Sequence, residues 1–304
     1  MARLRSDVTA RLRREGLAPG DDVRLTQEIR FCRTPDGVRL AYAMTGQGPP
    51  LVKAANWLTH LDHDWRSPVW RHWLVGLSRH RTLVRYDERG CGLSDRDVAE
   101  HSFEAWVRDL EAVVDAAGLE RFPVLGLSQG AGVAVAYAAR HPERVSRLVL
   151  YGGFAQGRRH RASGPAELAE HELELQVTRG GWGSDNPAFR QVFTSQFMPQ
   201  ASRELWAEFN ELQRRTAHPD DAAAILAVSA SIDVMAEAPL VRAPTLVLHA
   251  RDDRRPPFSQ GLLLASLVPG ARFVALDSAN HILLEDEPAW PVFLREVEAF
   301  LAEE

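Results

Sequence analysis

The sequence has few of the residues from which disulfide frameworks, metal clusters and basic nucleic-acid surfaces are built. Its 304 residues include two cysteines, Cys32 and Cys91, and a single lysine, Lys53. Two cysteines are too few for a disulfide framework or a thiolate metal site, so we expect both thiols to be free in a reducing compartment. The formal net charge of −5 provides no basic field, so no nucleic-acid partner is expected.

Long apolar runs and cofactor fingerprints are missing as well. Residues 1–20, MARLRSDVTARLRREGLAPG, lack the apolar core of a signal peptide, and no later stretch approaches the roughly 18–20 apolar residues that span a bilayer. We therefore expect a cytoplasmic protein without a membrane partner. No P-loop, dinucleotide fingerprint or metal motif occurs, which predicts an activity that needs no cofactor and no metal. Residues 1–26 are Arg-rich and amphipathic and predict a helical N-terminal extension.

Short apolar segments alternate with helical patterns over much of the remaining chain. Residues 28–44 predict a β-hairpin around Pro35-Asp36-Gly37, and further strands are predicted at 49–55, 81–87, 122–128, 145–153, 243–250 and 271–276. Helical patterns at 69–80, 102–118, 129–142, 259–267 and 287–304 separate these strands. This alternation indicates an α/β fold whose mostly parallel, doubly wound sheet is covered on both faces.

The alternation is interrupted near residue 155 and resumes near residue 240. The residues in between carry helical patterns only and include several aromatic side chains. We interpret 155–239 as a helical cap inserted into an α/β core made of 27–154 and 240–304.

A serine stands where a predicted strand becomes a predicted helix. The segment Gly126-Leu127-Ser128-Gln129-Gly130 matches G-x-S-x-G, the nucleophile elbow, in the required strand–turn–helix context. Such a turn lifts the serine hydroxyl above the sheet in a strained conformation, and side chains two residues away on either side would collide with it. The helix start also offers the free backbone N–H of Gln129 to a developing anion.

A serine nucleophile needs a base and an acid that orients the base. His281 follows the last predicted strand and therefore lies at the carboxyl edge of the sheet, as Ser128 does. Asp252 and Asp253 lie in the loop after the strand 243–250. From there either carboxylate is expected to reach a histidine in the loop of the neighbouring strand. The spacing alone leaves both aspartates open.

The motifs GLSQG, HARDDRRPP and NHILLEDEP, with the loop YDERGCGLSD, resemble those of the α/β-hydrolase fold family over about residues 28–303. The resemblance implies the α/β-hydrolase fold and a Ser–Asp–His order of catalytic residues. Actinobacterial-type hydrolase domains, some of them attached to cyclase or regulator modules, are more similar still. Their usual His-Ala-Arg-x-Asp pattern implies that the acid is Asp253.

The same resemblance implies a second oxyanion donor beside Gln129. Many family members carry His-Gly after the third strand, whereas this chain reads Ala55-Asn56, followed by Trp57. The backbone N–H of Trp57 then completes the oxyanion hole. The Asn56 amide is expected near the acyl group of the substrate, where it either donates a hydrogen bond or excludes bulky groups.

Three aromatic residues of the cap are candidates for the substrate pocket. Trp182, Phe193 and Phe197 are expected to line an apolar acyl pocket, and the alternative is that some of them form a small core within the cap. Arg89 is expected to tie down its own loop, the alternative being contact with a substrate carboxylate. Lys53 is expected to have a buried stem with its ammonium group at the sheet edge.

These features predict a serine hydrolase that cleaves a small or medium, mainly apolar ester, thioester or lactone through an acyl-enzyme. A serine at the elbow argues against haloalkane dehalogenase and epoxide hydrolase chemistry, which use a carboxylate nucleophile. Two alternatives stay open: C–C bond hydrolysis, acyl transfer or cyclisation by the same residues, and a ligand-sensing module with slow or no turnover. The expected partner is a small-molecule substrate, and the expected assembly is a monomer or homodimer.

Overall fold

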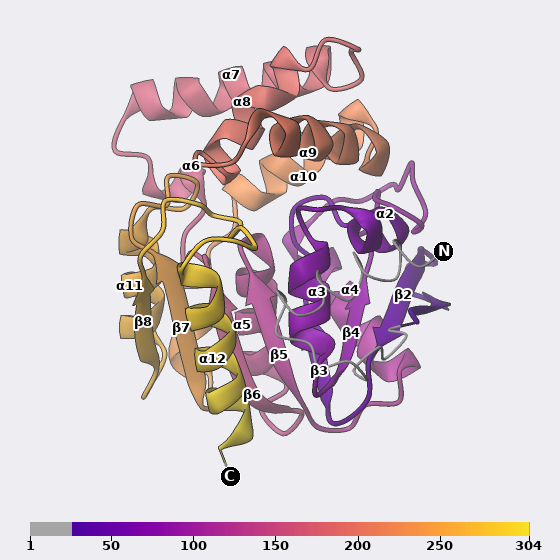
Figure 1. Cartoon of the computed structure of the whole chain (residues 1–304), viewed down its shortest axis with the longest axis vertical. Coiled ribbons are helices and arrows are strands. Elements are labelled where there is room, and N and C mark those ends of the chain that lie inside the picture. The colour runs from indigo at the N-terminus through magenta and orange to yellow at the C-terminus, as the bar shows by residue number, and fades with distance from the viewer. Residues whose placement is uncertain (1–25, 304) are drawn as a thin grey trace, which may run out of the picture.

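An eight-stranded sheet forms the centre of the protein (Figure 1). The structure is a computed structural model and describes residues 26–303. The strand order is β1-β2-β4-β3-β5-β6-β7-β8, with β2 antiparallel to both neighbours and all other pairs parallel. This confirms the predicted α/β fold. The strands are β1 (Glu28–Arg33), β2 (Arg39–Thr45), β3 (Pro50–Lys53), β4 (Thr82–Tyr86), β5 (Phe122–Leu127), β6 (Val145–Tyr151), β7 (Thr245–Ala250) and β8 (Arg272–Leu276).

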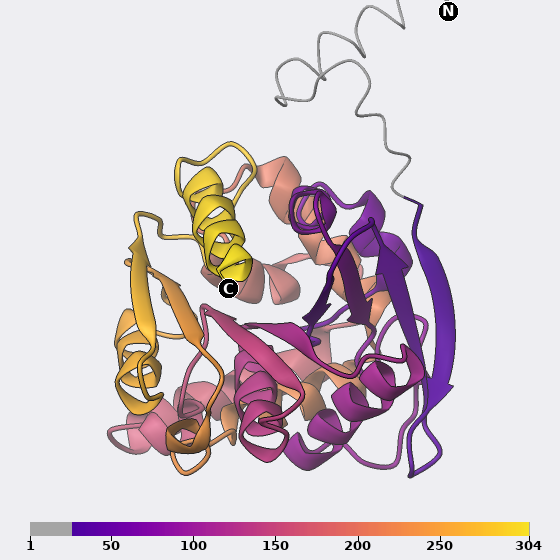
Figure 2. The same ribbon diagram turned by 90° about the horizontal axis from the view of Figure 1, so that it is seen from below.

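Helices cover both faces of the sheet, as Figure 2 shows from below. One face carries α3 (Arg71–Ser78) and α12 (Ala289–Ala302), and the other carries α4 (Phe103–Ala116), α5 (Gln129–Arg140) and α11 (Phe258–Leu267). The central strands are therefore buried on both sides and read as near-continuous apolar runs. Of the helices in residues 26–303, none combines the length and the apolar character needed to cross a membrane.

Local sequence signals explain several of these elements. The hairpin turns at Asp36 and Gly37, where Gly37 has φ +90°, and pairs Arg33 with Arg39. Ser102 caps α4 by accepting a hydrogen bond from the backbone N–H of Ala105 at 3.1 Å. The two thiols, Cys32 and Cys91, are free, as expected.

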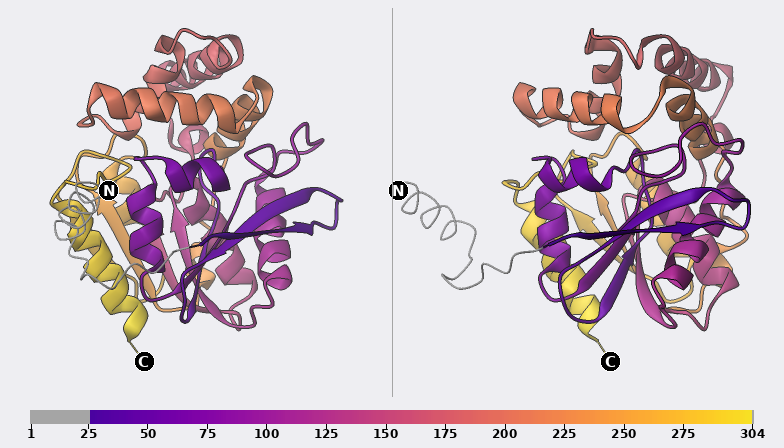
Figure 3. Two further views of the ribbon diagram at one scale, coloured as in Figure 1. Left: turned by 45° about the vertical axis from the view of Figure 1, so that its right-hand side comes forward. Right: turned by 90° about the vertical axis from the view of Figure 1, so that its right-hand side faces the viewer.

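Five consecutive helices lie between β6 and β7 and form the cap. Figures 1 and 3 show them above the carboxyl ends of the parallel strands. They fall within the range 155–239 expected for the insertion, and the short 3-10 helix η1 (Ala238–Leu240) leads from them back to the sheet. The cap helices are α6 (Arg158–Arg161), α7 (Pro165–Gly181), α8 (Ala188–Phe197), α9 (Arg203–Thr216) and α10 (Pro219–Ala230). The N-terminal extension expected in residues 1–26 lies outside the described residues, apart from its last position.

A short helix, α2 (Leu61–Arg66), occupies a segment that the sequence assigns to a loop. Its six residues, LDHDWR, are too few and too polar to show a helical period. His60 caps this helix, because its Nδ1 accepts a hydrogen bond from the backbone N–H of His63 at 3.4 Å. The helix packs against α3 and β2.

Arg89 ties three segments of the core together. Its guanidinium is fully buried and donates to both carboxylate oxygens of Asp109 on α4, at 2.6 and 2.8 Å, and to Asp36 in the hairpin turn at 2.8 Å. A further bond reaches the carbonyl oxygen of Glu100 at 3.2 Å. The structural interpretation of Arg89 is thus confirmed, since these bonds hold it away from the substrate pocket.

Replacing Arg89 is expected to destabilise the whole core. Arg89→Met leaves Asp109 buried without a countercharge, which typically costs about 3–5 kcal/mol of unfolding free energy. Urea unfolding monitored by circular dichroism measures this loss. The exposed pair of Arg66 and Asp62 supplies the control, because Arg66→Met should cost less than about 1 kcal/mol. Equal losses in the two variants would contradict a structural role for Arg89.

Candidate active site

Ser128 sits on a strained turn between β5 and α5. Its φ of 55° and ψ of −124° lie outside the regions that L-residues prefer. A Cβ at Gly126 would lie 2.6 Å from the Ala131 Cα, and one at Gly130 would lie 2.5 Å from the Ala55 carbonyl oxygen. Both glycines are therefore required by close backbone contacts, as the motif predicts.

His281 and Asp253 are brought together from the loops after β8 and β7. The Nδ1–H of His281 donates to Oδ2 of Asp253 at 2.6 Å, and both side chains are almost completely buried. The other carboxylate oxygen of Asp253 accepts a hydrogen bond from the Arg255 backbone N–H at 2.8 Å. Asp252 is exposed, so the geometry pairs the histidine with Asp253.

The opposite nitrogen of His281 is free to take a proton. Within residues 26–303, Nε2 of His281 is buried and has no hydrogen-bond partner. Two bonds to the backbone of His281 hold this residue in place. Its backbone carbonyl accepts a hydrogen bond from the Tyr151 hydroxyl at 2.9 Å, and its backbone N–H donates to the Phe197 carbonyl at 2.8 Å. The Tyr151 carbonyl in turn accepts from the Ser128 N–H at 2.9 Å, so one residue of β6 braces both segments.

The two backbone amides expected to form the oxyanion hole are not used in hydrogen bonds within residues 26–303. Neither the Trp57 nor the Gln129 N–H donates to any acceptor in the described part of the chain. The side chain of Gln129 is anchored by a 2.9 Å hydrogen bond to buried Glu88, which fixes the first turn of α5. Leu58, directly after Trp57, has φ +51°, an uncommon conformation for a branched residue.

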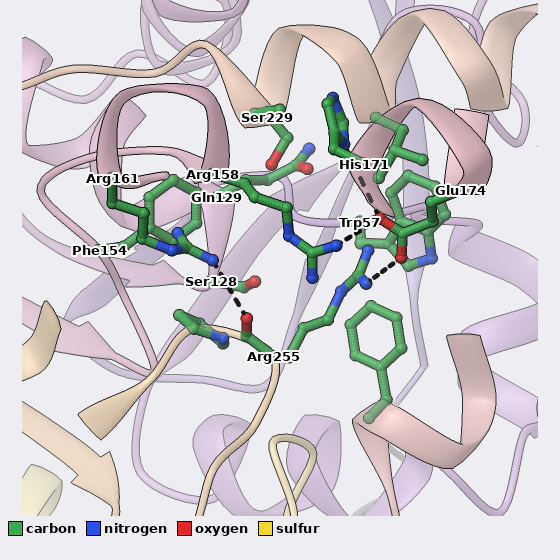
Figure 4. A pocket seen from close by; sticks show the side chains of 14 residues that line it. Trp57, Ser128, Gln129, Phe154, Arg158, Arg161, His171, Glu174, Ser229 and Arg255 are labelled. Carbon is green, nitrogen blue, oxygen red and sulfur yellow. Dashed lines mark hydrogen bonds and ion pairs between the residues drawn. The ribbon is translucent and has the colours of Figure 1, made fainter. Parts of the chain in front are cut away.

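A cavity of about 50 Å³ opens over Ser128 beneath the cap (Figure 4). Trp57, Gln129 and Phe197 contribute to its wall. Much of the remaining wall is charged, which the sequence analysis did not foresee. These charged and polar side chains are Arg158, Arg161, His171, Glu174 and Arg255.

Two of the expected pocket aromatics pack behind the wall. The Trp57 ring lies 5.8 Å from Trp182, 6.0 Å from Phe193 and 6.4 Å from Phe197, measured between ring centroids. Only Phe197 of the three cap aromatics lines the cavity over Ser128. Trp182 and Phe193 therefore pack with Trp57 in a core between cap and sheet, whereas the alternative left open by the sequence was a small core within the cap.

The structure places Asn56 in a neighbouring cavity of about 10 Å³. There its side-chain oxygen accepts a hydrogen bond from Nζ of Lys53, and it does not line the cavity over Ser128. The Asn56 amide therefore does not lie at the site where the sequence analysis expected it. The Lys53 head is buried inside the fold rather than at an open sheet edge.

Burial dominates the electrostatics around Lys53. It lowers the Lys53 pKa to about 8, although the nearby Asp64 carboxylate partly opposes the change. Burial likewise raises the pKa of Asp64 to about 6, against the effect of Arg85, which pairs with it at 3.3 Å. A buried ionisable cluster therefore lies directly behind the loop that carries the Trp57 amide.

The fold and the site define an α/β hydrolase. The family model described as the alpha/beta hydrolase fold matches residues 63–288, and the chain belongs to this family. Relatives of the chain are hydrolases, so it is an enzyme of the hydrolase class.

Proteins similar to this chain have names that imply hydrolysis of different kinds of bond. The chain is 29% identical over 284 residues to 2-hydroxy-6-oxo-2,4-heptadienoate hydrolase of Pseudomonas putida, covering 85% of this chain and 87% of that one. It is 25% identical to pyrrolizixenacetamide deacetylase of Xenorhabdus hominickii, covering 84% and 93%. Among solved structures, a Pseudomonas aeruginosa hydrolase superposes with a TM-score of 0.74 at 25% identity, covering 94% and 100%. The enol-lactonase of Burkholderia xenovorans shares the fold, with a TM-score of 0.72 at 24% identity and coverage of 90% and 100%.

Removing the buried lysine should change how stability depends on pH. A folded-state pKa of about 8, below the usual value of 10.5, means that the unfolded chain binds more protons between these pH values. The stability contribution of Lys53 therefore rises with pH in this window. Between pH 7 and 9.5 the wild type should gain on the order of 2 kcal/mol relative to Lys53→Met.

Urea unfolding of both proteins at several pH values measures the difference. Arg79→Met, which removes an exposed cation, is the control and should follow the wild-type curve. Parallel curves for the wild type and Lys53→Met would show that the lysine titrates normally.

Proposed function

We propose that this enzyme is a serine hydrolase in which Ser128 is the nucleophile, His281 the general base and Asp253 the acid that orients the base. The observation that carries the proposal is the 2.6 Å bond between Asp253 and His281, while the buried Nε2 of the histidine has no partner among residues 26–303. The bond fixes the tautomer whose Nε2 accepts a proton. Ser128, on the elbow, is the hydroxyl proposed to supply that proton.

In this mechanism Oγ of Ser128 attacks a substrate carbonyl carbon while its proton passes to Nε2 of His281. The negative charge on the carbonyl oxygen is stabilised by the backbone N–H groups of Gln129 and Trp57. The imidazolium then protonates the leaving group, and water releases the acyl group with the same histidine as base. A small or medium ester, thioester or lactone fits this chemistry, and the deacetylase and lactonase names among similar proteins support an acyl-transfer substrate.

Hydrolysis of a C–C bond is a second candidate. It is favoured by the 29% identity to a 2-hydroxy-6-oxo-2,4-heptadienoate hydrolase over most of both chains. Incubation with that dienoate, followed by its ultraviolet absorbance, tests this reaction against a series of 4-nitrophenyl esters. Turnover of the dienoate that exceeds that of every ester would assign the C–C activity, and turnover of esters alone would exclude it.

Substitutions of the proposed triad should separate catalysis from folding. Ser128→Ala is expected to lower kcat on a 4-nitrophenyl ester by roughly 10⁴–10⁶-fold, since the nucleophile is lost. Asp253→Asn should also lower kcat by several orders of magnitude, because it disturbs the histidine tautomer. Asp252→Asn is the matched control and should leave kcat unchanged, since Asp252 is exposed.

A fluorophosphonate probe provides a second readout of the same site. It should label the wild type once, at Ser128, and should not label Ser128→Ala. Full activity in the Ser128→Ala variant would refute the mechanism. Stoichiometric labelling of the wild type without turnover of any ester or dienoate would instead favour a ligand-sensing role.

A further inference from the structure

Three arginine side chains converge over Ser128 from two parts of the chain. Arg158 and Arg161 come from α6 at the start of the cap, and Arg255 comes from the loop after β7. All three line the cavity that contains Ser128, and Figure 4 shows their guanidinium groups directed into it.

One carboxylate partly neutralises this cluster. Glu174 on α7 accepts from Arg158 at 3.1 Å and from Arg255, and its side chain is 6% exposed. Although burial alone would raise the Glu174 pKa, the charge of Arg255, the His171 ring 3.9 Å away and the charge of Arg158 bring it to about 2. Glu174 is therefore ionised at neutral pH, and the three guanidinium groups retain an excess positive charge.

Arg161 has no carboxylate partner within residues 26–303. Its Nη atoms donate to the backbone carbonyls of Gln156 at 3.1 Å and Arg255 at 3.4 Å. Burial, followed by repulsion from Arg158 and Arg255, lowers the Arg161 pKa to about 10. Glu174 therefore pairs with Arg158 and Arg255, and the charge of the half-buried Arg161 is left without a paired carboxylate in the described residues.

The arginines are also held rigidly. The Arg255 guanidinium stacks over Phe193 at 5.5 Å and over Phe197 at 5.1 Å, and it donates to the Gln196 side chain at 2.9 Å. Arg161 lies over the Phe154 ring at 5.9 Å. Stacked guanidinium groups lose little further conformational entropy when they bind a planar anion.

We propose that Arg158, Arg161 and Arg255 form a subsite for a carboxylate on the substrate, separate from the carbonyl that Ser128 attacks. This inference rests on the proposed function and narrows its substrate class. A carboxylate matches the planar fork of a guanidinium, and Arg158 and Arg255 each use only one Nη atom in bonds to protein acceptors. The substrates are therefore acidic esters, lactones or oxo-acids whose free carboxylate lies a few bonds from the scissile carbonyl.

A matched pair of esters tests the subsite. Mono(4-nitrophenyl) glutarate and its methyl ester have the same scissile bond and nearly the same shape, but only the first carries a second charge. The wild type should have at least a tenfold higher kcat/KM on the acid at low ionic strength. Added salt should reduce this preference, because mobile ions screen the arginines.

Arg161→Gln should remove much of the preference. Loss of one charge-assisted contact is expected to lower kcat/KM on the acid by roughly 10- to 100-fold and to leave the methyl ester within about threefold of the wild type. Arg159→Gln, on the exposed side of the same helix, is the matched control and should change neither value. Arg161→Lys should restore part of the activity on the acid, since it keeps the charge without the planar fork.

Direct binding distinguishes failure of the subsite from failure of the proposed function. By calorimetry, the Ser128→Ala protein should bind glutarate but not the neutral glutaramide, and adding Arg161→Gln should weaken glutarate binding at least tenfold. If the wild type hydrolyses both esters equally and glutarate does not bind, the subsite is refuted and the hydrolase proposal stands. If glutarate binds but neither ester is turned over, the proposed hydrolysis fails while the anion site remains.

Discussion

The sharp turn after β5 is the constraint on which the site depends. At Ser128 the backbone adopts φ 55°, a conformation that typically costs about 1–3 kcal/mol for a residue other than glycine. It persists because the loop after β3 and the first turn of α5 approach so closely that no side chain fits at Gly130. The same contact sets the first turn of α5 against the loop that carries Trp57. Strain at one residue thus positions the serine and two backbone donors relative to the sheet.

The loop that carries Trp57 is held from both sides. Below it, Asn56 is bonded to buried Lys53, next to the ion pair of Asp64 and Arg85. Above it, the Trp57 indole donates to Gln213 on α9 at 3.3 Å and packs against the aromatic rings of the cap. The Trp57 side chain therefore ties the loop that carries the proposed oxyanion donor to the cap.

Sequence reasoning identified the features that depend on local patterns. The apolar alternation indicated the sheet, and the spacing around Ser128 indicated the turn. His281 and Asp253 could be predicted as neighbours because each follows a predicted strand, and parallel strands end at one edge of the sheet. The choice of Asp253 over Asp252 came from the family resemblance rather than from the spacing.

The features that were missed arise only when distant segments meet. Asn56 bonds to Lys53 in a separate cavity, a placement that no composition signal marks. The charged cavity wall combines Arg255, from the loop after β7, with Arg158 and Arg161, nearly a hundred positions earlier in the chain. An isolated arginine in a loop usually indicates a solvated surface, so no local signal could distinguish these three from others. The pair Arg158-Arg159 shows this directly, since one side chain lines the cavity and its neighbour is exposed.

The arginine cluster also limits how the cavity can be used. The cavity has a volume of about 50 Å³, and we expect side chains or the cap to adjust when a substrate binds. Arg158 and Glu174 both belong to the cap, whereas Arg255 belongs to the core, and Glu174 binds both arginines. The ion pairs that join cap and core across the cavity therefore involve Arg158 and Arg255, two of the arginines proposed to bind the substrate carboxylate.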